Sequence, residues 1–426
     1  MRRFGSSQFI SASVLRWAVG VRRPTCRLAP IFVVALIIAA FGCREDTESP
    51  TGPEIEPALK TDRIRALPFR QISAGWVHTC GVTRDNLAYC WGSNFGGQLG
   101  EGTTTDRLRP VPVAGGLQFR EVSTGSAYTC GVTSDDLAYC WGANSAGQLG
   151  NGTTSPTLTP VAVAGGLLFR QVSTGAFHTC GVTTANQAFC WGSVGAGRGN
   201  EIGGEARYTP FEVGAGLRFR EVSASLVTSA LGHFTCGVTL EDVAYCWGEN
   251  EFGQLGIGST GVLSWAPVQV AGGMEFRSIS AGATRTCGLT PERLAFCWGA
   301  NWYGAVGDGT DNGRPAPVQV SGGLRFRDLS VGGEYHICGI TQIGRAYCWG
   351  RNFEGQLGDG TTTNRLMPVP VAGRLHFRQL GTGTSHTCGV VNGSVAYCWG
   401  ANNAGQLGDG TTTPSSTPVA VAAPAP

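Results

Sequence analysis

The stretch Cys80-Gly-Val-Thr-Arg-Asp-Asn-Leu-Ala-Tyr-Cys90-Trp91-Gly92 decides the fold, because the chain repeats its pattern at a nearly constant interval. The shared pattern is Cys-Gly-x-x, a short variable spacer, and Ala-(Tyr/Phe)-Cys-Trp-Gly. Seven copies begin at Cys80, Cys130, Cys180, Cys236, Cys287, Cys338 and Cys388, with steps of 50, 50, 56, 51, 51 and 50 residues. Self-similarity at a period of about 50 residues is typical of propellers and other repeat architectures.

Each repeat contains four short stretches that favour β-strands. In the first repeat they are residues 69–73, 78–83, 87–91 and 111–113. They are rich in β-branched and aromatic residues and are separated by Gly, Asn, Asp and Pro, with no helical period. Four strands per unit is typical of a propeller blade, which buries both faces only by stacking against neighbours. We therefore predict an all-β fold, a seven-bladed β-propeller of four-stranded antiparallel blades over residues 69–426.

Three motifs resemble the regulator-of-chromosome-condensation repeat family over residues 69–421. They are Gly-x-x-His-Thr-Cys-Gly, Tyr-Cys-Trp-Gly and Asn-x-x-Gly-Gln-Leu-Gly. The resemblance implies a seven-bladed propeller. It implies function less narrowly, because the family includes a guanine-nucleotide exchange factor, a plant ultraviolet photoreceptor and a secreted bacterial β-lactamase inhibitor, and one fold hosts many functions.

The repeated cysteine pairs predict disulfides. Two cysteines stand ten positions apart across each hairpin, and opposed residues of an antiparallel pair lie within disulfide reach. Metal ligation is the competing interpretation, but no Cys-x-x-Cys occurs; reduced structural thiols are a third. We predict seven bridges: Cys80–Cys90, Cys130–Cys140, Cys180–Cys190, Cys236–Cys246, Cys287–Cys297, Cys338–Cys348 and Cys388–Cys398.

The N-terminal residues predict export. Six arginines precede an apolar run at residues 31–41 that is too short to span a bilayer, so residues 1–42 are interpreted as a signal peptide. Ala40-Phe41-Gly42-Cys43 resembles a bacterial lipoprotein box, which predicts lipidation of Cys43; ordinary cleavage after Gly42 is the alternative. Residues 43–68 then form a flexible linker. Arg44 favours the outer membrane, so we expect a bacterial, extracytoplasmic protein that is lipid-anchored or secreted.

The charge balance argues against a nucleic-acid partner. The whole chain carries a formal charge of +2, and loss of residues 1–42 leaves 25 basic and 29 acidic residues. A nucleic-acid-binding domain is strongly basic. We expect contact with membranes through the lipid anchor alone and a monomeric propeller.

Catalytic and cofactor motifs are absent from the sequence. It contains no Gly-x-Ser-x-Gly, P-loop or zinc-helix pattern. Four histidines occupy one repeat position, where other repeats have Tyr128, Phe234 and Arg285, so we interpret it as structural. Asp359-Gly360-Thr361 and its equivalents suit turns better than a calcium site. We expect no metal, no cofactor and no enzyme activity.

Departures from the repeat gather in repeats 3 to 5. Residues 194–200 replace the Asn-x-x-Gly-Gln-Leu-Gly loop, and repeat 4 is six residues longer near residues 224–232. In an up-and-down blade the first and third connections share a face, so these departures lie on one face of the ring. Exposed aromatic residues there suit a partner-binding patch, although neutral drift is the alternative. The candidates are Tyr208, His233, Phe234, Trp265, Trp302 and Tyr303.

The function hypothesis from the sequence is a non-enzymatic, extracytoplasmic propeller scaffold. It binds another protein or a cell-surface polymer through the loop face. The alternative, implied by the family resemblance, is a guanine-nucleotide exchange factor-like regulator of a small GTPase. An export signal and disulfides conflict with that alternative, because small GTPases are cytosolic.

Overall fold

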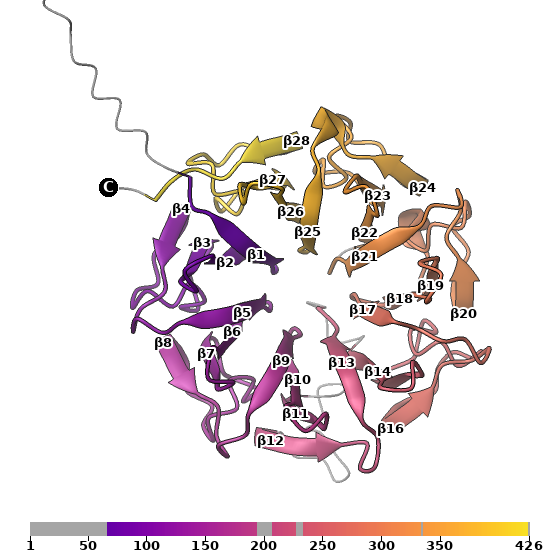
Figure 1. The fold of residues 1–426 in the computed structure, drawn as a ribbon, viewed down its shortest axis with the longest axis horizontal. Coiled ribbons are helices and arrows are strands. Elements are labelled where there is room, and N and C mark those ends of the chain that lie inside the picture. The colour runs from indigo at the N-terminus through magenta and orange to yellow at the C-terminus, as the bar shows by residue number, and fades with distance from the viewer. Residues whose placement is uncertain (1–65, 194–206, 227–232, 334, 425–426) are drawn as a thin grey trace, which may run out of the picture. The chain divides into compact units, whose positions relative to one another are not determined.

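The propeller is a closed ring of seven four-stranded antiparallel sheets (Figure 1). The computed structural model describes residues 66–193, 207–226, 233–333 and 335–424. The predicted signal peptide, Cys43 and the linker as far as residue 65 lie outside the described residues, as do residues 194–200 and 227–232. Each blade uses four consecutive strands of one repeat in the order β1-β2-β3-β4. The predicted all-β, seven-bladed fold is confirmed.

In six blades the innermost strand begins at the Phe-Arg pair, and in the fifth it begins directly after that pair, at Ser278. The second strand of each blade begins two positions before the first cysteine. The innermost strands are β1 (Phe69–Ala74), β5 (Phe119–Thr124), β9 (Phe169–Thr174), β13 (Phe219–Ala224), β17 (Ser278–Ala281), β21 (Phe326–Val331) and β25 (Phe377–Thr382). The second strands are β2 (His78–Thr83), β6 (Tyr128–Thr133), β10 (His178–Thr183), β14 (Phe234–Thr239), β18 (Arg285–Leu289), β22 (His336–Thr341) and β26 (His386–Val391).

The third strands carry the Ala-(Tyr/Phe)-Cys-Trp-Gly motif, and the fourth form the rim of the ring. The third strands are β3 (Ala88–Gly92), β7 (Ala138–Gly142), β11 (Ala188–Gly192), β15 (Ala244–Gly248), β19 (Ala295–Gly299), β23 (Ala346–Gly350) and β27 (Ala396–Gly400). The outermost strands are β4 (Arg107–Pro112), β8 (Thr157–Ala162), β12 (Arg207–Val213), β16 (Ser264–Gln269), β20 (Arg314–Gln319), β24 (Arg365–Pro370) and β28 (Ser415–Ala420). Two short 3-10 helices, η1 (Trp302–Gly304) and η2 (Ala372–Arg374), lie in connections.

The outermost strand starts four residues earlier than the sequence predicts. A bulge explains the difference, since Cys90 pairs with Val111 while Gly92 pairs with Arg107, which places two more residues on the outer strand than on its partner. The extra length contains the proline of the Pro-Val motif. Every outermost strand has this proline: Pro110, Pro160, Pro210, Pro267, Pro317, Pro368 and Pro418.

The seven predicted disulfides are present. In each blade the two cysteines pair directly across the second and third strands, as Cys80 does with Cys90. Their Cα atoms lie 4.0–4.1 Å apart, and all fourteen residues are fully buried. The hairpin turn between them places Asn86 at a positive φ of 63°, a conformation that Asn and Asp adopt more readily than other non-Gly residues. Seven such bridges indicate an oxidising environment.

The hydrophobic core lies between neighbouring blades rather than within them. One cluster combines Phe69, Ile72 and Trp91 of the first blade with Cys388 and Cys398 of the seventh, all buried. The Phe and Trp rings of each blade tilt against each other with centroids 5.6–5.9 Å apart. Each disulfide therefore packs against the aromatic pair of the next blade. The packing of neighbouring blades thus depends on the geometry of the disulfide-bonded hairpin.

The ring closes without strand exchange, because the first blade is built from residues 69–112 and the seventh from residues 377–420. Side chains join them. Arg378 donates to the Phe69 carbonyl at 2.5 Å, and His386 Nε2 lies 2.8 Å from Thr79 Oγ1. The Trp91 indole donates to the Gln406 carbonyl at 3.0 Å.

In the described part of the chain, no helix has the length and apolar character needed to cross a membrane.

Replacing Cys80 and Cys90 together by alanine should lower the free energy of unfolding by about 2–3 kcal/mol, because a short closed loop loses its cross-link in the unfolded chain. Urea denaturation of the oxidised protein measures the change, with non-reducing mass spectrometry confirming the other six bridges. The Cys388→Ala/Cys398→Ala variant is the matched control and should lose a similar amount. An unchanged unfolding midpoint in both variants would contradict a stabilising role.

Candidate functional site

The repeated histidines connect neighbouring blades. His78 Nε2 lies 2.9 Å from Thr129 Oγ1 of the second blade, and that hydroxyl donates to the Gln98 carbonyl at 2.9 Å. Because the single hydroxyl proton of Thr129 is used on Gln98, His78 must donate from Nε2. Burial lowers the pKa of His78 to about 3, so the ring stays neutral at physiological pH. His178, His336 and His386 make the same contact, which assigns this position a structural role.

The acidic loop residues are used in turns. Asp359 Oδ1 accepts bonds from the backbone N–H and the hydroxyl of Thr361 at 3.0 and 2.7 Å, and Oδ2 accepts from Arg365 at 2.8 Å. These bonds hold the pKa of Asp359 below its usual value. Within the described residues, no group of three or more His, Cys, Asp or Glu side chains is arranged to hold a metal ion.

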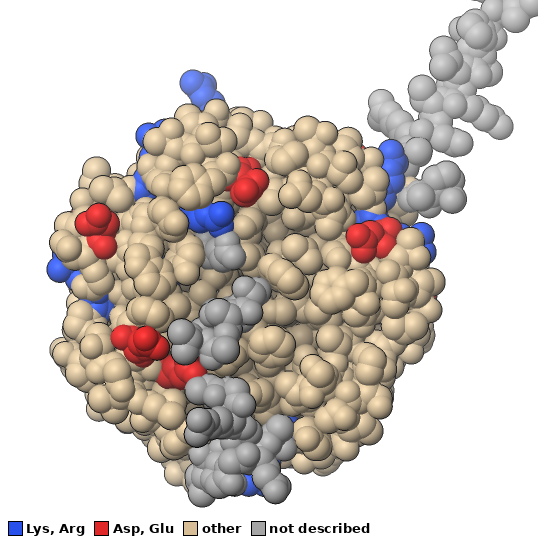
Figure 2. All heavy atoms as spheres, turned by 180° about the vertical axis from the view of Figure 1, so that it is seen from behind, with Lys and Arg blue, Asp and Glu red and all other residues tan. Residues whose placement is uncertain are grey.

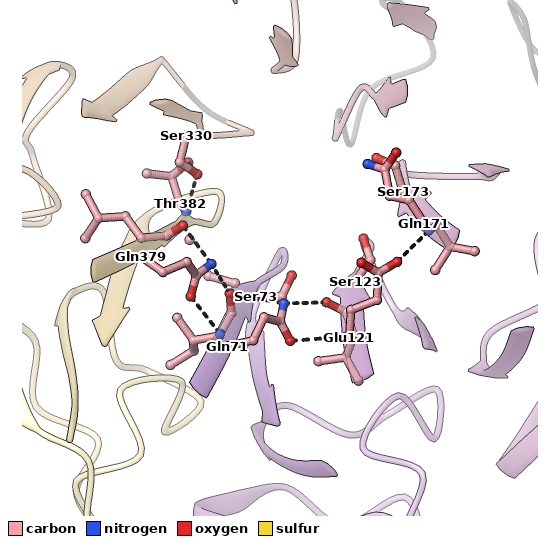
Figure 3. Close-up of a pocket in the computed structure, with 15 residues that line it drawn as sticks. Gln71, Ser73, Glu121, Ser123, Gln171, Ser173, Ser330, Gln379 and Thr382 are labelled. Carbon is pink, nitrogen blue, oxygen red and sulfur yellow. Dashed lines mark hydrogen bonds between the residues drawn. The ribbon is translucent and has the colours of Figure 1, made fainter. Parts of the chain in front are cut away.

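Polar side chains line an axial channel of about 240 Å³ between the innermost strands (Figure 3). Gln71 Oε1 accepts the N–H of Val122 at 3.1 Å, and its Nε2 donates to the Val122 carbonyl at 2.8 Å. Gln171 and Gln379 make the same two bonds to the blade that follows each of them around the ring. We call this contact, in which a glutamine side chain joins the innermost strands of two neighbouring blades, the clasp. Through it the residues that line the channel are hydrogen-bonded to one another.

Two glutamates replace glutamine in this clasp. Glu121 Oε1 accepts the N–H of Val172 at 2.8 Å, and Glu221 Oε1 accepts that of Ile279 at 2.5 Å. Burial raises the pKa of each carboxyl to about 7, although Arg120 and Arg70 beside Glu121, and Arg220 and Arg170 beside Glu221, oppose the rise. A protonated carboxyl has the same hydrogen-bonding pattern as a glutamine amide, with one acceptor and one donor oriented to a peptide.

Five aromatic side chains form a continuous row on the face that carries the first and third connections. We call Phe252, Trp302, Tyr335, Tyr303 and Phe353 the aromatic cluster. Successive ring centroids in this order lie 4.9, 5.3, 5.7 and 5.4 Å apart. The row crosses the fourth, fifth and sixth blades. Figure 2 shows this face, on which charged side chains are sparse.

Three residues of the aromatic cluster are exposed, and its backbone is strained at two positions. Trp302, Tyr303 and Phe353 are 42%, 39% and 51% exposed. Tyr303 and Tyr335 adopt φ values of 62° and 59°, a left-handed conformation that is unusual for bulky residues. Strained backbone of this kind is concentrated at binding and catalytic sites.

A sequence change in the fifth blade accounts for the geometry at Tyr303. In the first blade the Gln98 side chain accepts the N–H of Gly96 at 2.8 Å and so holds that loop turn. Ala305 occupies the equivalent position in the fifth blade and has no such acceptor. Tyr303, which corresponds to Gly96, is therefore free to take a different backbone conformation and to turn its ring towards Tyr335.

Two of the predicted partner-binding residues are buried, and the prediction that they are exposed is wrong. Phe234 is 1% exposed because it occupies the histidine position of the repeat and packs in the core between the fourth and fifth blades. His233 is 3% exposed, with its ring 5.6 Å from Phe177 and 6.2 Å from His178.

Tyr208 and Trp265 are both 42% exposed, on the outermost strands β12 and β16. Tyr208 lies over the α-carbon of Gly147 in the preceding blade, which leaves no room there for a side chain. Neither residue has a ring contact with the aromatic cluster among the described residues. The structure thus brings Trp302 and Tyr303 together and leaves Tyr208 and Trp265 at the rim.

Sequence reasoning missed Phe252, Tyr335 and Phe353. Phe353 occupies the same loop position as Trp302, and Phe252 the same position as Tyr303, so comparing aromatic residues between adjacent repeats would have identified them.

Two family models described as Regulator of chromosome condensation (RCC1) repeat match the chain. One matches residues 85–132, 135–182, 241–289, 344–390 and 393–425, and the other residues 69–98, 119–148, 169–197 and 326–356. Human E3 ubiquitin-protein ligase HERC2 is 30% identical over 141 residues, which are 33% of this chain and 3% of HERC2. Ultraviolet-B receptor UVR8 of Arabidopsis thaliana is 31% identical over 143 residues, which are 33% of this chain and 32% of UVR8. The matched segments thus span a third or less of these relatives.

Solved structures show the same fold. Prp20p from Saccharomyces cerevisiae superposes with a TM-score of 0.69 at 18% identity, covering 80% of this chain and 87% of Prp20p. Human WBSCR16 gives a TM-score of 0.65 at 21% identity, covering 75% of this chain and 86% of WBSCR16. At these identities the likeness concerns the fold alone.

Replacing Glu121 and Glu221 together by glutamine should remove a pH-dependent loss of stability. The pKa of each carboxyl is about 7 in the folded protein against an ordinary value of 4.5. The contribution of the two protonated carboxyls to the free energy of unfolding is therefore complete below pH 4.5 and is lost as the pH rises through 7. We expect the double variant to match the original protein at pH 4.5 and to exceed it by roughly 1–3 kcal/mol per site at pH 8. Urea denaturation at both pH values measures this.

The matched control is Gln171→Glu, which introduces a carboxyl into a clasp that lacks one and should destabilise the ring at pH 8 more than at pH 4.5. If the double variant is no more stable than the original protein at pH 8, the pKa values of the two carboxyls are not raised in the folded ring.

Proposed function

This chain belongs to the Regulator of chromosome condensation (RCC1) repeat family, and from that premise we propose that it is a non-enzymatic, extracytoplasmic propeller that binds a protein partner through the aromatic cluster. The single observation that carries this proposal is the row of packed rings Phe252, Trp302, Tyr335, Tyr303 and Phe353 on the loop face, in which Trp302, Tyr303 and Phe353 are exposed. Elsewhere among the described residues, the exposed aromatic residues Trp76, Phe95, Tyr208 and Trp265 have no ring contact with this row, and each Trp of the Cys-Trp-Gly motif is buried.

The composition of the aromatic cluster favours a protein over a polysaccharide. Protein interfaces are enriched in Trp, Tyr, Phe and Arg and depleted in Lys, Glu and Asp at their centres. The cluster contains the first three, and Arg285 and Arg351 lie over the rings of Tyr335 and Phe353 at 4.7 and 5.3 Å. Rigid aromatic residues that are already packed against one another lose little side-chain entropy on binding.

The proposed location rests on the seven disulfides, the predicted signal peptide of residues 1–42 and the predicted lipidation of Cys43. Disulfides persist in oxidising compartments and are rare in the cytosol. Lipidation of Cys43 would hold the propeller at a membrane while residues 44–68 serve as the tether. Fractionation of a Cys43→Ser variant tests the anchor separately from partner binding.

The family also supports a second candidate, regulation of a small GTPase. Yeast Prp20p, which shares the fold, binds Gsp1p and histones according to its structural description. For this chain the seven disulfides favour the extracytoplasmic proposal. The ligase activity of HERC2 gives no support for an enzyme here, because the matched segment is 3% of that protein.

The oxidised full-length protein should recover a surface or periplasmic protein after cross-linking, and the Trp302→Ala/Tyr303→Ala variant should recover at least about ten-fold less. Loss of two central aromatic residues commonly costs 2 kcal/mol or more in binding. Quantitative mass spectrometry of the recovered proteins measures the difference.

Trp265→Ala is the matched control, because it removes an aromatic residue of equal exposure outside the cluster, and it should change recovery by less than about three-fold. Equal recovery with the original protein and the double variant would overturn the proposal. Recovery of polysaccharide alone would move the partner class to a cell-surface polymer, and accelerated GDP release from a small GTPase would favour the second candidate.

A further inference from the structure

Arg285 is a buried cation without a hydrogen-bond acceptor. Its side chain is fully buried, and Nε and both terminal nitrogens have no partner. Among the described residues, no carboxylate forms an ion pair with it. The neighbour that faces its charge is Tyr335, whose ring lies 4.7 Å from the guanidinium carbon. Burial lowers the pKa of Arg285 to about 10, so it remains a cation at neutral pH.

The sequence explains why this arginine has no acceptor. Arg285 stands where four other blades have histidine, and that histidine bonds a threonine in the next blade. The corresponding residue of the sixth blade is Ile337, which has no hydroxyl, whereas Thr79, Thr129, Thr179, Thr235, Thr286 and Thr387 occupy the other six positions. The junction between the fifth and sixth blades has therefore lost its acceptor and gained a cation.

The arrangement is energetically costly. A buried charge without a partner costs several kcal/mol, whereas a cation–π contact recovers roughly 2 kcal/mol. Tyr335, which covers the guanidinium, also holds a left-handed backbone conformation with φ of 59°. A guanidinium has five N–H donors in a fork that matches the two oxygens of a carboxylate or a phosphate.

We propose that Arg285 is a binding site for an oxyanion, a carboxylate or phosphate group, that enters beneath the aromatic cluster when the Tyr335 side chain swings aside. The anion would supply the acceptors that Ile337 cannot. The ring of Tyr335 would then leave its position over the guanidinium, which changes the surface formed with Trp302, 5.3 Å away. Oxyanion binding and the shape of the aromatic cluster are thereby coupled.

This inference concerns the same surface as the proposed function and rests on it for its biological context, but it is tested without any partner protein. A failed pull-down with successful ion binding would remove the partner proposal alone. A failed ion titration with a successful pull-down would remove the Arg285 site alone.

The test titrates the oxidised full-length protein with sodium acetate in one arm and sodium phosphate in another, at constant ionic strength set by sodium chloride. A ligand that binds only the folded state raises the unfolding midpoint in a saturable way. We expect a rise of about 2 °C or more in at least one arm. Whichever arm responds distinguishes the carboxylate from the phosphate.

Arg285→Gln should abolish the saturable rise, and Arg325→Gln, which removes an exposed arginine, should retain it. Equal rises in the original protein and Arg285→Gln, or no rise in either arm, would overturn the proposal. Tyr335→Ala provides a second measurement if Arg285→Gln does not fold. It uncovers the guanidinium and should lower the half-maximal anion concentration at least three-fold, and an unchanged value would also overturn the proposal.

Discussion

At five junctions between blades, one carbonyl oxygen accepts two hydrogen bonds from the next blade. The Gln98 carbonyl accepts the indole N–H of Trp141 at 2.9 Å and the hydroxyl of Thr129 at 2.9 Å, both from the next blade. Gln148, Gln254, Gln356 and Gln406 do the same. The buried Trp must place its only polar atom on an acceptor, so this bond fixes how far each blade turns from its neighbour. The loop sequence that presents the carbonyl is therefore as constrained as the core.

The fold could be predicted from sequence because each constraint recurs at a fixed period. Seven copies of the Cys-Trp-Gly pattern gave the number of blades, and the ten-residue cysteine spacing gave the disulfides. The candidate site was harder to predict from the sequence, because residues that contact one another across blades are far apart in the chain. The sequence predicts an exposed Phe234, whereas this residue replaces a buried histidine, and Tyr335 is missed because its connection resembles the others. Periodicity identifies which positions are equivalent but does not show which of them face solvent.

Departures from the repeat coincide in space at the fifth blade. Ala305 replaces the glutamine that secures the loop, Arg285 replaces the histidine, and Ile337 replaces the threonine it would bond. Each change alone would weaken one contact between blades. Together they place Tyr303 at a positive φ beside Tyr335 and leave a cation beneath the Tyr335 ring. Four other blades keep the contact between histidine and threonine, so this combination of changes is local to one junction.

The proline of each outermost strand has a consequence for how the ring meets other molecules. The seven rim strands lie at the edges of their sheets, and an unprotected edge can pair with an extended chain. In six of them a backbone carbonyl already accepts a glycine N–H from the preceding blade, as Leu366 does from Gly309 at 3.1 Å. Pro368 and its six equivalents interrupt the row of N–H donors, and a bulge twists the strand at the same place. These features disfavour strand addition from outside around the circumference. An extended chain therefore finds few unpaired peptide donors in register along the rim of the ring.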